Sequence, residues 1–280
     1  FFMRKNIIIR LNIHLGAHPL RQQKIKKKIL TQHQSTTPKM TTTATTTPIY
    51  TTIAPVNIAI IKYWGKKDTK LHIPLNSSLS FTLNMNDLKS KTSVVATTDP
   101  SIAHSTMILN GKVEDFSGNK RIQNVLNLIE RDAQAEWFLK AKTDGTLPQY
   151  KLVIVSENNF PTAAGLASSA SGYCCLVYAL AQLYEVKTDL SVIMRLGSGS
   201  ACRSVYGGFV AWEMGTDHES SKAVQIKDES FWPNIQILVA VASSEKKAVS
   251  SSSGMQLSVA TSKKLAHRAE HIVPKRMQEM

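Results

Sequence analysis

The spacing of apolar residues divides the chain into segments with the two-residue period of strands and segments with the longer period of helices. Residues 56–61 form a short, mostly apolar run, and Leu79, Phe81, Leu83 and Met85 alternate with polar residues. Because successive side chains of a strand point to opposite faces, the run predicts a strand and the alternation predicts a half-buried strand. Further strands are predicted at 92–98 and 152–155, and a buried strand at 235–242.

Three longer segments carry the helical period. Between 119 and 139 the apolar residues recur every three or four positions, which predicts one amphipathic helix over the sheet. A second helix is predicted at 170–186, where apolar residues from Cys174 to Tyr184 share one face, and the pattern of 257–280 is typical of helix. Strands that come first, with helices packed on one side, favour an α+β fold.

Length and composition favour two domains. The 280 residues, 42% of them hydrophobic, are enough to bury a core in each. Trp232-Pro233 stands just before the last predicted strand and is the expected seam. We therefore predict a leader at 1–50, a first domain at 51–232 and the beginning of a second domain at 233–280.

The first fifty residues differ from the rest in composition. They contain nine Lys or Arg and no acidic residue, and 41–47 is a Thr-rich tract. Most of the net charge of +14 therefore lies there, and the mildly basic body suits a small anionic substrate without indicating nucleic acid. Such a composition cannot bury enough surface to fold, so we predict a disordered leader. Three interpretations stay open: a transit-type presequence, extra translated sequence upstream of a start at Met40, and a nucleic-acid-binding arm.

Apolar runs and cysteines bear on the cellular setting. No uninterrupted apolar run reaches the roughly 18 residues of a membrane span, so no membrane helix is expected. Cys174, Cys175 and Cys202 form neither a disulfide framework nor a zinc-like spacing with histidine. A reducing, intracellular setting follows, so the cytosol is expected, and peroxisomal or organellar targeting by the leader stays open.

A segment of small residues links the strand at 152–155 to the helix at 170–186. Its Ala, Gly and Ser residues let the backbone approach a ligand closely. Since the unpaired N–H groups and the positive end of a helix attract anions, the segment predicts a phosphate-binding loop. A tight turn with serine caps is the alternative. The candidate residues are Pro161, Ala163, Ala164, Gly165, Leu166, Ala167, Ser168 and Ser169.

Two further segments carry charge beside apolar or small residues. Lys62-Tyr63-Trp64-Gly65-Lys66 follows the first predicted strand, and two lysines four apart at a strand end supply point charges for phosphates. Core packing is the favoured interpretation of Trp64. The Gly/Ser-rich segment 197–204 contains Arg203, whose planar fork suits a carboxylate or a phosphate. A surface arginine in a flexible loop is the alternative.

These three segments together resemble one enzyme family. The pattern Pro-x-x-x-Gly-Leu-x-Ser-Ser-Ala at 161–170 resembles the ATP loop of the superfamily of galactokinase, homoserine kinase and mevalonate kinase (GHMP). The motif at 62–66 stands where its kinases carry Gly-Glu-His, and 197–204 resembles a substrate-holding loop. From about residue 54 to 280 the chain is therefore similar to the mevalonate diphosphate decarboxylase family.

The resemblance implies a fold and a reaction. The fold is α+β, with a GHMP-kinase-type N-terminal domain, related in shape to a domain of a ribosomal protein, and the start of an incomplete ferredoxin-like C-terminal domain. The reaction is the decarboxylation of (R)-5-diphosphomevalonate to isopentenyl diphosphate, which uses ATP and Mg²⁺ and belongs to isoprenoid, sterol and lipid metabolism. A homodimer is implied for full-length members, with no nucleic acid and no membrane as partner.

The resemblance also implies residue roles. Lys62 would neutralise phosphate charge, Ser169 would orient the γ-phosphate, and Arg203 would hold the substrate carboxylate. Substrate contacts are implied for Tyr63, Trp64, Gly65, Lys66, Arg121, Ser198, Gly199, Ser200, Ala201, Cys202, Arg203 and Ser252.

The chain departs from the family pattern in places. Leu196 and Ala248 stand where a basic and an acidic residue are common. The family's catalytic aspartate, in a sequence resembling Asp-Ala-Gly-Pro-Asn, is not among the 280 residues, so we expect a C-terminally truncated member. Two other functions stay open: a sister kinase that phosphorylates without decarboxylation, and a non-catalytic fragment that binds nucleotide or partners.

Overall fold

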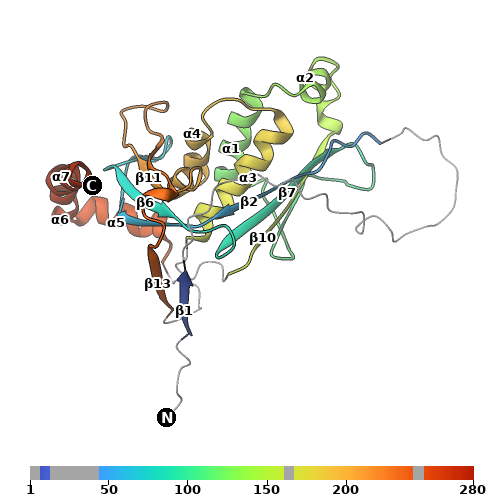
Figure 1. Cartoon of the computed structure of the whole chain (residues 1–280). Coiled ribbons are helices and arrows are strands. Elements are labelled where there is room, and N and C mark those ends of the chain that lie inside the picture. The colour runs from blue at the N-terminus through green and yellow to red at the C-terminus, as the bar shows by residue number, and fades with distance from the viewer. Residues whose placement is uncertain (1–6, 13–43, 161–166, 242–248) are drawn as a thin grey trace, which may run out of the picture.

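The computed structural model describes residues 7–12, 44–160, 167–241 and 249–280, with side chains described outside 7–12 and 239–241. Two sheets and a group of helices surround helix α3, and the last helices of the chain gather at one end of the molecule (Figure 1).

The elements follow one another from strands to helices and back. The strands are β1 (Ile7–Asn12), β2 (Tyr50–Pro55), β3 (Asn57–Ile61), β4 (Lys66–Asp68), β5 (Ile73–Pro74), β6 (Ser78–Thr82), β7 (Lys89–Thr97), β8 (Thr106–Leu109), β9 (Lys112–Glu114), β10 (Lys151–Asn158), β11 (Phe209–Trp212), β12 (Ala223–Lys227) and β13 (Gln236–Val241). The helices are α1 (Lys120–Arg131), α2 (Glu136–Thr143), α3 (Ser168–Tyr184), α4 (Leu190–Gly197), α5 (Ser251–Thr261), α6 (Lys263–His267) and α7 (Val273–Glu279), with short turns η1 (Leu147–Gln149), η2 (Gly199–Ser204), η3 (Glu229–Phe231) and the π-helical η4 (Arg268–Ile272).

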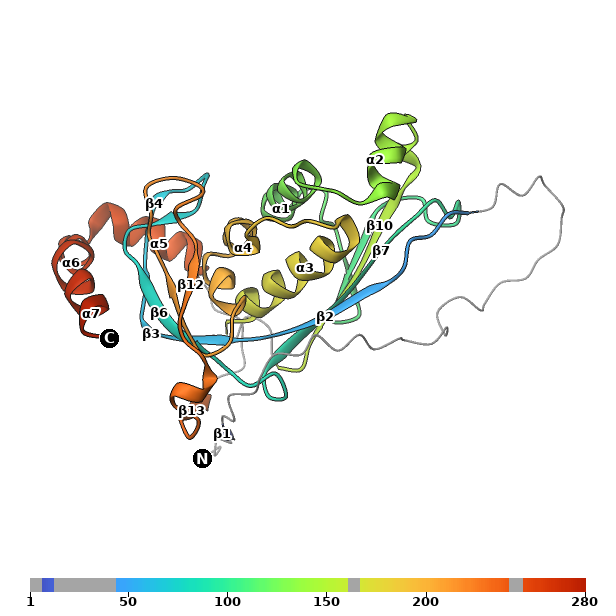
Figure 2. The same ribbon diagram turned by 45° about the horizontal axis from the view of Figure 1, so that its top comes forward.

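Strand β10 lies in the middle of a five-stranded sheet of order β2-β7-β10-β8-β9. It pairs antiparallel with β7 and parallel with β8. Leu152 and Ile154 are buried on one face, next to Ala96 and Val94 of β7. Helix α3 covers this face (Figure 2). The strands predicted within 92–98 and 152–155 are therefore confirmed, and the second extends well beyond its apolar run.

Strand β6 belongs to the four-stranded sheet β12-β11-β6-β3, whose polar side carries much of the candidate site. One side of β6 packs in an apolar cluster that includes Leu79. The other side, with Ser78, Ser80 and Thr82, is buried as well, because these hydroxyls bond to Arg203. The prediction of a half-buried strand is wrong for this reason. The alternation is real, but the polar side faces another part of the protein and not solvent.

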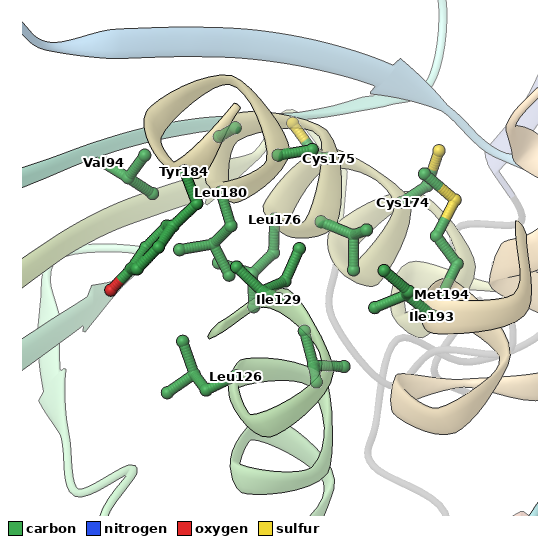
Figure 3. Packing of buried hydrophobic residues seen from close by; sticks show 14 of the residues in the cluster. Val94, Leu126, Ile129, Cys174, Cys175, Leu176, Leu180, Tyr184, Ile193 and Met194 are labelled. Atoms are coloured by element: carbon green, nitrogen blue, oxygen red, sulfur yellow. The ribbon is translucent and has the colours of Figure 1, made fainter. Parts of the chain in front are cut away.

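Helix α3 is buried along most of its length. Cys174, Cys175 and Leu180 are fully buried, and Figure 3 shows Leu180 near Ile129 of α1 and Cys174 near Met194 of α4. Burial raises the pKa of the Cys174 thiol well above its usual range. All three cysteines of the chain are free and buried, so they serve as small core residues here.

Helices α1 and α2 stand where one continuous helix was predicted at 119–139, so that prediction is wrong. Helix α1 ends at Arg131, and the backbone N–H of Asp132 closes its last turn. The N–H of Ala135 then donates to the carbonyl of Tyr184 at the end of α3. Apolar residues on both sides of the break still face the core, which is why the periodicity does not reveal it.

Two pieces of the first fifty residues have structure where no folded element was expected. Strand β1 pairs antiparallel with β13, and Thr47 exchanges hydrogen bonds with the backbone of Ala96 at the end of β7. The remaining residues up to 43 lie outside the described ranges. Strand β13 itself differs from the buried strand predicted at 235–242, because Leu238 is 65% exposed.

Helices α5 to α7 confirm the prediction of a mostly helical segment at 257–280, and α5 begins earlier, at Ser251. Figure 2 shows them beyond the sheet edge, with α5 next to β4. Within the described ranges, every helix is too short or too polar to cross a membrane.

Candidate active site

The loop after helix α4 lies against aromatic side chains at very close range. A Cβ added at Gly197, the last residue of α4, would overlap the ring of Tyr173 on α3. At Gly199 an added Cβ would come within 2.7 Å of Trp212 and 2.8 Å of the Tyr63 hydroxyl. The glycines of this loop are therefore required by contact and not by flexibility alone.

Hydroxyl groups join the end of the predicted phosphate-binding loop, 161–169, to the loop 197–204. The Oγ atom of Ser169, in the first turn of α3, lies 3.1 Å from that of Ser198, and Ser198 Oγ lies 3.3 Å from Ser200 Oγ. Of the predicted phosphate-binding residues, Pro161, Ala163, Ala164, Gly165 and Leu166 lie outside the described ranges. The structure places Ala167, in left-handed backbone at φ 55°, and the first two residues of α3, Ser168 and Ser169.

Arg203 lies at the centre of the site and is 2% exposed. Its Nη1 donates to Ser78 Oγ at 2.7 Å, its Nε to Ser80 Oγ at 3.0 Å, and its Nη2 lies 3.5 Å from Asn57 Oδ1. The ring centroid of Tyr63 is 5.7 Å from the guanidinium carbon. Burial lowers the pKa of Arg203. No ion pair within the described ranges involves it. Because the side chain is buried, the alternative of a surface arginine is wrong.

Three further cations lie near Arg203 or near one another. Lys62 follows the end of β3, Lys66 opens β4, and Arg121 lies in the first turn of α1. Partial burial, and then the charge of Arg203, lowers the pKa of Lys62. Burial, and then Arg121, lowers the pKa of Lys66 to about 8. None of the three pairs with an acidic side chain in the part of the chain that the structure describes.

His72 lies in the same positive field. Burial, and then the charge of Lys66, lowers its pKa to about 4. Its Nδ1 lies 3.0 Å from the carbonyl oxygen of Arg195, so the neutral ring donates a hydrogen bond there. A cluster of cations without counter-ions gains most from a ligand that carries several negative charges.

A pocket of about 280 Å³ opens at the start of helix α3. It lies between α3, the first turn of α1 and strand β8. Its walls are mainly apolar, with hydroxyl, amide and carboxylate groups among them: Met107, Leu109, Glu114, Asp115, Phe116, Asn119, Ile122, Ser156, Asn158, Ser168, Ser169, Gly172, Tyr173 and Leu176. Because Ser169 lies both in this pocket and beside Ser198, the pocket adjoins the loop that carries Ser198 and Arg203.

The remaining predicted residues divide into two groups. Ser252, on α5, accepts a hydrogen bond from Arg121 Nη2 at 2.5 Å, so it lies with the cations. Ala201 and Cys202 are fully buried, and burial raises the pKa of the Cys202 thiol to about 12. Neither residue is exposed to a ligand in this structure.

Trp64 and Gly65 lie in contact with helix α5. The indole N–H of Trp64 donates to Ser258 Oγ at 3.0 Å, and a Cβ added at Gly254 would come 3.4 Å from the Trp64 ring. A Cβ at Gly65 would lie 2.7 Å from Val259. Trp64 is 38% exposed, so the favoured interpretation of core packing is wrong, and its described contacts are with α5.

Sequence reasoning missed the residues that hold Arg203. Asn57 donates from Nδ2 to the Ser200 carbonyl and to Ser204 Oγ, at 2.9 and 2.8 Å. Ser78 and Ser80 accept from the guanidinium. Two features of the sequence could have indicated them: Asn57 stands inside an apolar strand, and Ser78 and Ser80 occupy alternate positions of another strand. Because buried polar groups need hydrogen-bond partners, such residues indicate a polar contact inside the protein.

The described side chains suit a nucleotide better than they suit a divalent cation that is bound by protein groups alone. The pocket beside the N-terminus of α3 and the adjoining cations suit a nucleotide polyphosphate. The described residues contain no group of three or more His, Cys, Asp or Glu side chains that could hold a metal by themselves. Magnesium, which prefers phosphate oxygens and water with few protein ligands, would therefore come with the phosphates.

Two family models match most of the chain. The family model described as diphosphomevalonate decarboxylase-like N-terminal domain matches residues 54–223, and the model described as mevalonate 5-diphosphate decarboxylase C-terminal domain matches 237–280. The diphosphomevalonate decarboxylase of Saccharomyces cerevisiae is 53% identical over 232 residues, which cover 81% of this chain and 58% of that protein. The chain therefore spans a little over half the length of this relative.

Solved structures agree with the sequence relatives. Mevalonate diphosphate decarboxylase from Trypanosoma brucei matches with a TM-score of 0.73 and 42% identity, over 82% of this chain and 59% of that one. A structure described as MDDEF in complex with MVAPP, AMPPCP and magnesium matches with a TM-score of 0.60 and 33% identity, over 82% and 67% of the two chains.

Proposed function

Because the chain belongs to the diphosphomevalonate decarboxylase family, we propose that it acts in the ATP-dependent decarboxylation of (R)-5-diphosphomevalonate to isopentenyl diphosphate. The observation that carries the proposal is the cluster of Lys62, Lys66, Arg121 and Arg203, which have no acidic partner among the described residues and adjoin the Ser169–Ser198 bridge. A substrate with a diphosphate and a carboxylate supplies the negative charge that this cluster lacks.

The nucleotide end of the proposal rests on the pocket at the start of α3. An apolar pocket with a few polar groups suits a base, and the α3 N-terminus attracts phosphate oxygens. Ser169 is the residue that reaches from this pocket to the substrate loop. The similar MDDEF structure with AMPPCP, an ATP analogue, and magnesium supports ATP and Mg²⁺ as cofactors.

In the proposed reaction, the tertiary hydroxyl oxygen attacks the γ-phosphorus of ATP. The bond from γ-phosphorus to its bridging oxygen breaks as ADP leaves, and the hydroxyl proton passes to a base. The carbon–oxygen bond of the phosphorylated intermediate then breaks as inorganic phosphate leaves with the bonding electrons. The electrons of the bond to the carboxylate form the alkene as CO₂ departs. Positioning and charge neutralisation are the main contributions of the protein to such a transfer.

Each side chain has a proposed part in these steps. Lys62 neutralises phosphate charge next to the transferred group, and Ser169 orients that group by a hydrogen bond. Arg203 holds the substrate carboxylate through Nη2, whose contact with Asn57 is long at 3.5 Å. Lys66, Arg121 and Ser252 grip the diphosphate. The proposed setting is the cytosol, and the proposed pathway is isoprenoid and sterol biosynthesis.

Product analysis tests the proposal against its two rivals. The 280-residue chain is incubated with ATP, Mg²⁺ and substrate labelled at the carboxylate carbon, and ADP and labelled CO₂ are measured. Equal amounts of both support decarboxylation. ADP without CO₂ supports a sister kinase, and nucleotide binding without ADP supports a non-catalytic binding protein.

A further inference from the structure

Arg268 connects the last helices of the chain to the backbone of Lys62. Its Nη2 donates to the Lys62 carbonyl oxygen at 2.6 Å, and its Nη1 donates to Asn76 Oδ1 at 3.3 Å. The amide nitrogen of Asn76 donates to the same carbonyl at 3.2 Å. Arg268 is 206 residues away from Lys62 in sequence, so only the docking of the helices brings them together.

The segment that receives these bonds has no regular backbone pairing of its own. Residues 62–65 lie between β3 and β4, outside any strand. The Lys62 carbonyl is therefore held by side chains, and the direction of the Lys62 side chain depends on them. Partial burial, and then the charge of Arg203, lowers the pKa of Lys62, so the two cations repel each other. The hydrogen bonds from Arg268 and Asn76 hold the Lys62 carbonyl, and with it the start of this segment.

Arg268 is the first residue of a π-helical turn that lies between two buried residues. Leu265 and Val273 are 8% and 2% exposed, while Ile272 is 45% exposed. In a regular helix a buried face continues after three, four, seven and eight residues, so Val273, eight residues after Leu265, continues the face that Leu265 begins. The π-helical turn Arg268–Ile272 lies between these two residues. Arg268 thus lies between two buried anchors and points at the Lys62 backbone.

We infer that Arg268 is a positioning residue, which holds the Lys62 backbone so that the Lys62 ammonium stays beside Arg203 and meets the phosphate of the ligand. The role in ligand binding rests on the proposed function. The role in placing Lys62 does not, because it concerns contacts that exist without a ligand.

Two variants and two controls test the inference. Arg268→Gln removes the charged donors, and Arg268→Lys keeps the charge but lacks the planar pair of Nη donors that spans the two acceptors. Arg276→Gln removes an equal charge from the exposed Arg276–Glu279 pair of α7. Val273→Ala loosens the same helices through their apolar contact and leaves the Lys62 carbonyl untouched.

The first measurement follows Lys62 without any ligand. Acetylation of each lysine is followed by mass spectrometry over a range of pH, with Lys112 as an internal reference. In Arg268→Gln we expect the half-point pH for Lys62 to rise, because the freed side chain leaves Arg203 and regains water. Lys112 should not change, Arg276→Gln should not shift Lys62, and Val273→Ala should shift Lys62 less than Arg268→Gln does. An unchanged Lys62 half-point in Arg268→Gln, or an equal shift in Val273→Ala, overturns the inference.

The second measurement is the affinity for (R)-5-diphosphomevalonate by calorimetry. We expect about a tenfold loss in Arg268→Gln and Arg268→Lys, as for one charge-assisted hydrogen bond, with ATP affinity unchanged. If the parent chain fails to bind this compound while the Lys62 shift is seen, the proposed function fails and the positioning role stands. If the parent binds and both Arg268 variants bind equally well, the positioning role fails.

Discussion

The hydroxyl of Ser169 lies 3.1 Å from the hydroxyl of Ser198, although the two residues are 29 positions apart. The first turn of helix α3 and the end of helix α4 therefore meet at one hydrogen bond. A ligand bound by each would be adjacent at this point, which is the arrangement that transfer of a phosphoryl group requires.

Ser169→Ala should slow phosphoryl transfer more than it weakens ATP binding. The variant loses one hydrogen bond to a charged phosphate, worth about 1.5–3 kcal/mol, and we expect ADP release to fall by about tenfold or more. ATP affinity should change less, because the pocket walls and the helix end remain. Calorimetry with ATP and an ADP-coupled assay measure the two quantities. Ser101→Ala, at an exposed turn, is the matched control, and equal ADP release by both variants would contradict the proposed role of Ser169.

Arg203→Met should weaken substrate binding with little change in the stability of the protein. The substitution removes a buried charge that has no acidic partner among the described residues, and such a charge is costly to bury. It also leaves the hydroxyls of Ser78 and Ser80 without this donor, so we expect the free energy of unfolding to change by no more than about 1 kcal/mol. Affinity for the diphosphate substrate should fall by tenfold or more, on the order of one charge-assisted contact.

Urea unfolding and calorimetry test this pair of expectations. Arg203→Lys is the companion variant, since it keeps the charge but cannot make the forked contacts of a guanidinium. Retained substrate affinity in Arg203→Met would contradict the assignment of Arg203 to the ligand carboxylate.

The sequence predicts the repeating parts of this fold better than its interruptions. The strand within 92–98 and the helix near 170–186 appear because their apolar periods match their burial. The break at Asp132 does not disturb the apolar period, since α1 and α2 face the same core. It is set by a hydrogen bond from Ala135 to the distant Tyr184 carbonyl, and single-sequence patterns contain no such contact.

The site was predictable as charges and small residues, but not as an arrangement. Lys62, Lys66 and Arg203 could be chosen from their motifs, and the structure brings them together. Asn57 could not be chosen, because an amide inside an apolar strand has no evident partner until Ser200 and Ser204 are placed beside it. Trp64 was assigned to the core from its residue type, whereas its contacts are with α5, a partner almost two hundred residues away.

Lys66 should make anion binding depend on pH. Its pKa is lowered to about 8 by burial and by Arg121, so the free protein loses this charge as pH rises through 8. We expect affinity for inorganic diphosphate to fall above that pH, measured by titration calorimetry from pH 6.5 to 9.5. In Lys66→Arg the decline near pH 8 should disappear, because a guanidinium stays charged over this range. An unchanged decline in that variant would contradict the assignment.

Lys66 should affect stability in the opposite direction. The unfolded chain holds the Lys66 proton up to the ordinary value of 10.5, whereas the folded chain releases it near 8. Between these values the unfolded state binds more protons, so this group makes the folded state more stable as pH rises. Comparing urea unfolding of the parent and Lys66→Met at pH 7 and 9.5 isolates the contribution, and the gain with pH should be smaller in the variant.

Gly199→Ala should damage the site by contact alone. The added Cβ would lie 2.7 Å from Trp212 and 2.8 Å from the Tyr63 hydroxyl, and both rings are packed edge to face with centroids 4.7 Å apart. Overpacking of this kind costs about 1–3 kcal/mol, and relief requires the loop, which also carries Ser198 and Arg203, to move away from Trp212 and Tyr63. We therefore expect lower stability together with weaker substrate binding. Gly118→Ala is the matched control, because its Cβ meets nothing within 4 Å, and we expect it to change the free energy of unfolding by less than about 0.5 kcal/mol. If Gly199→Ala behaved like Gly118→Ala in unfolding and in calorimetry, the loop would have to be less closely packed than these contacts require.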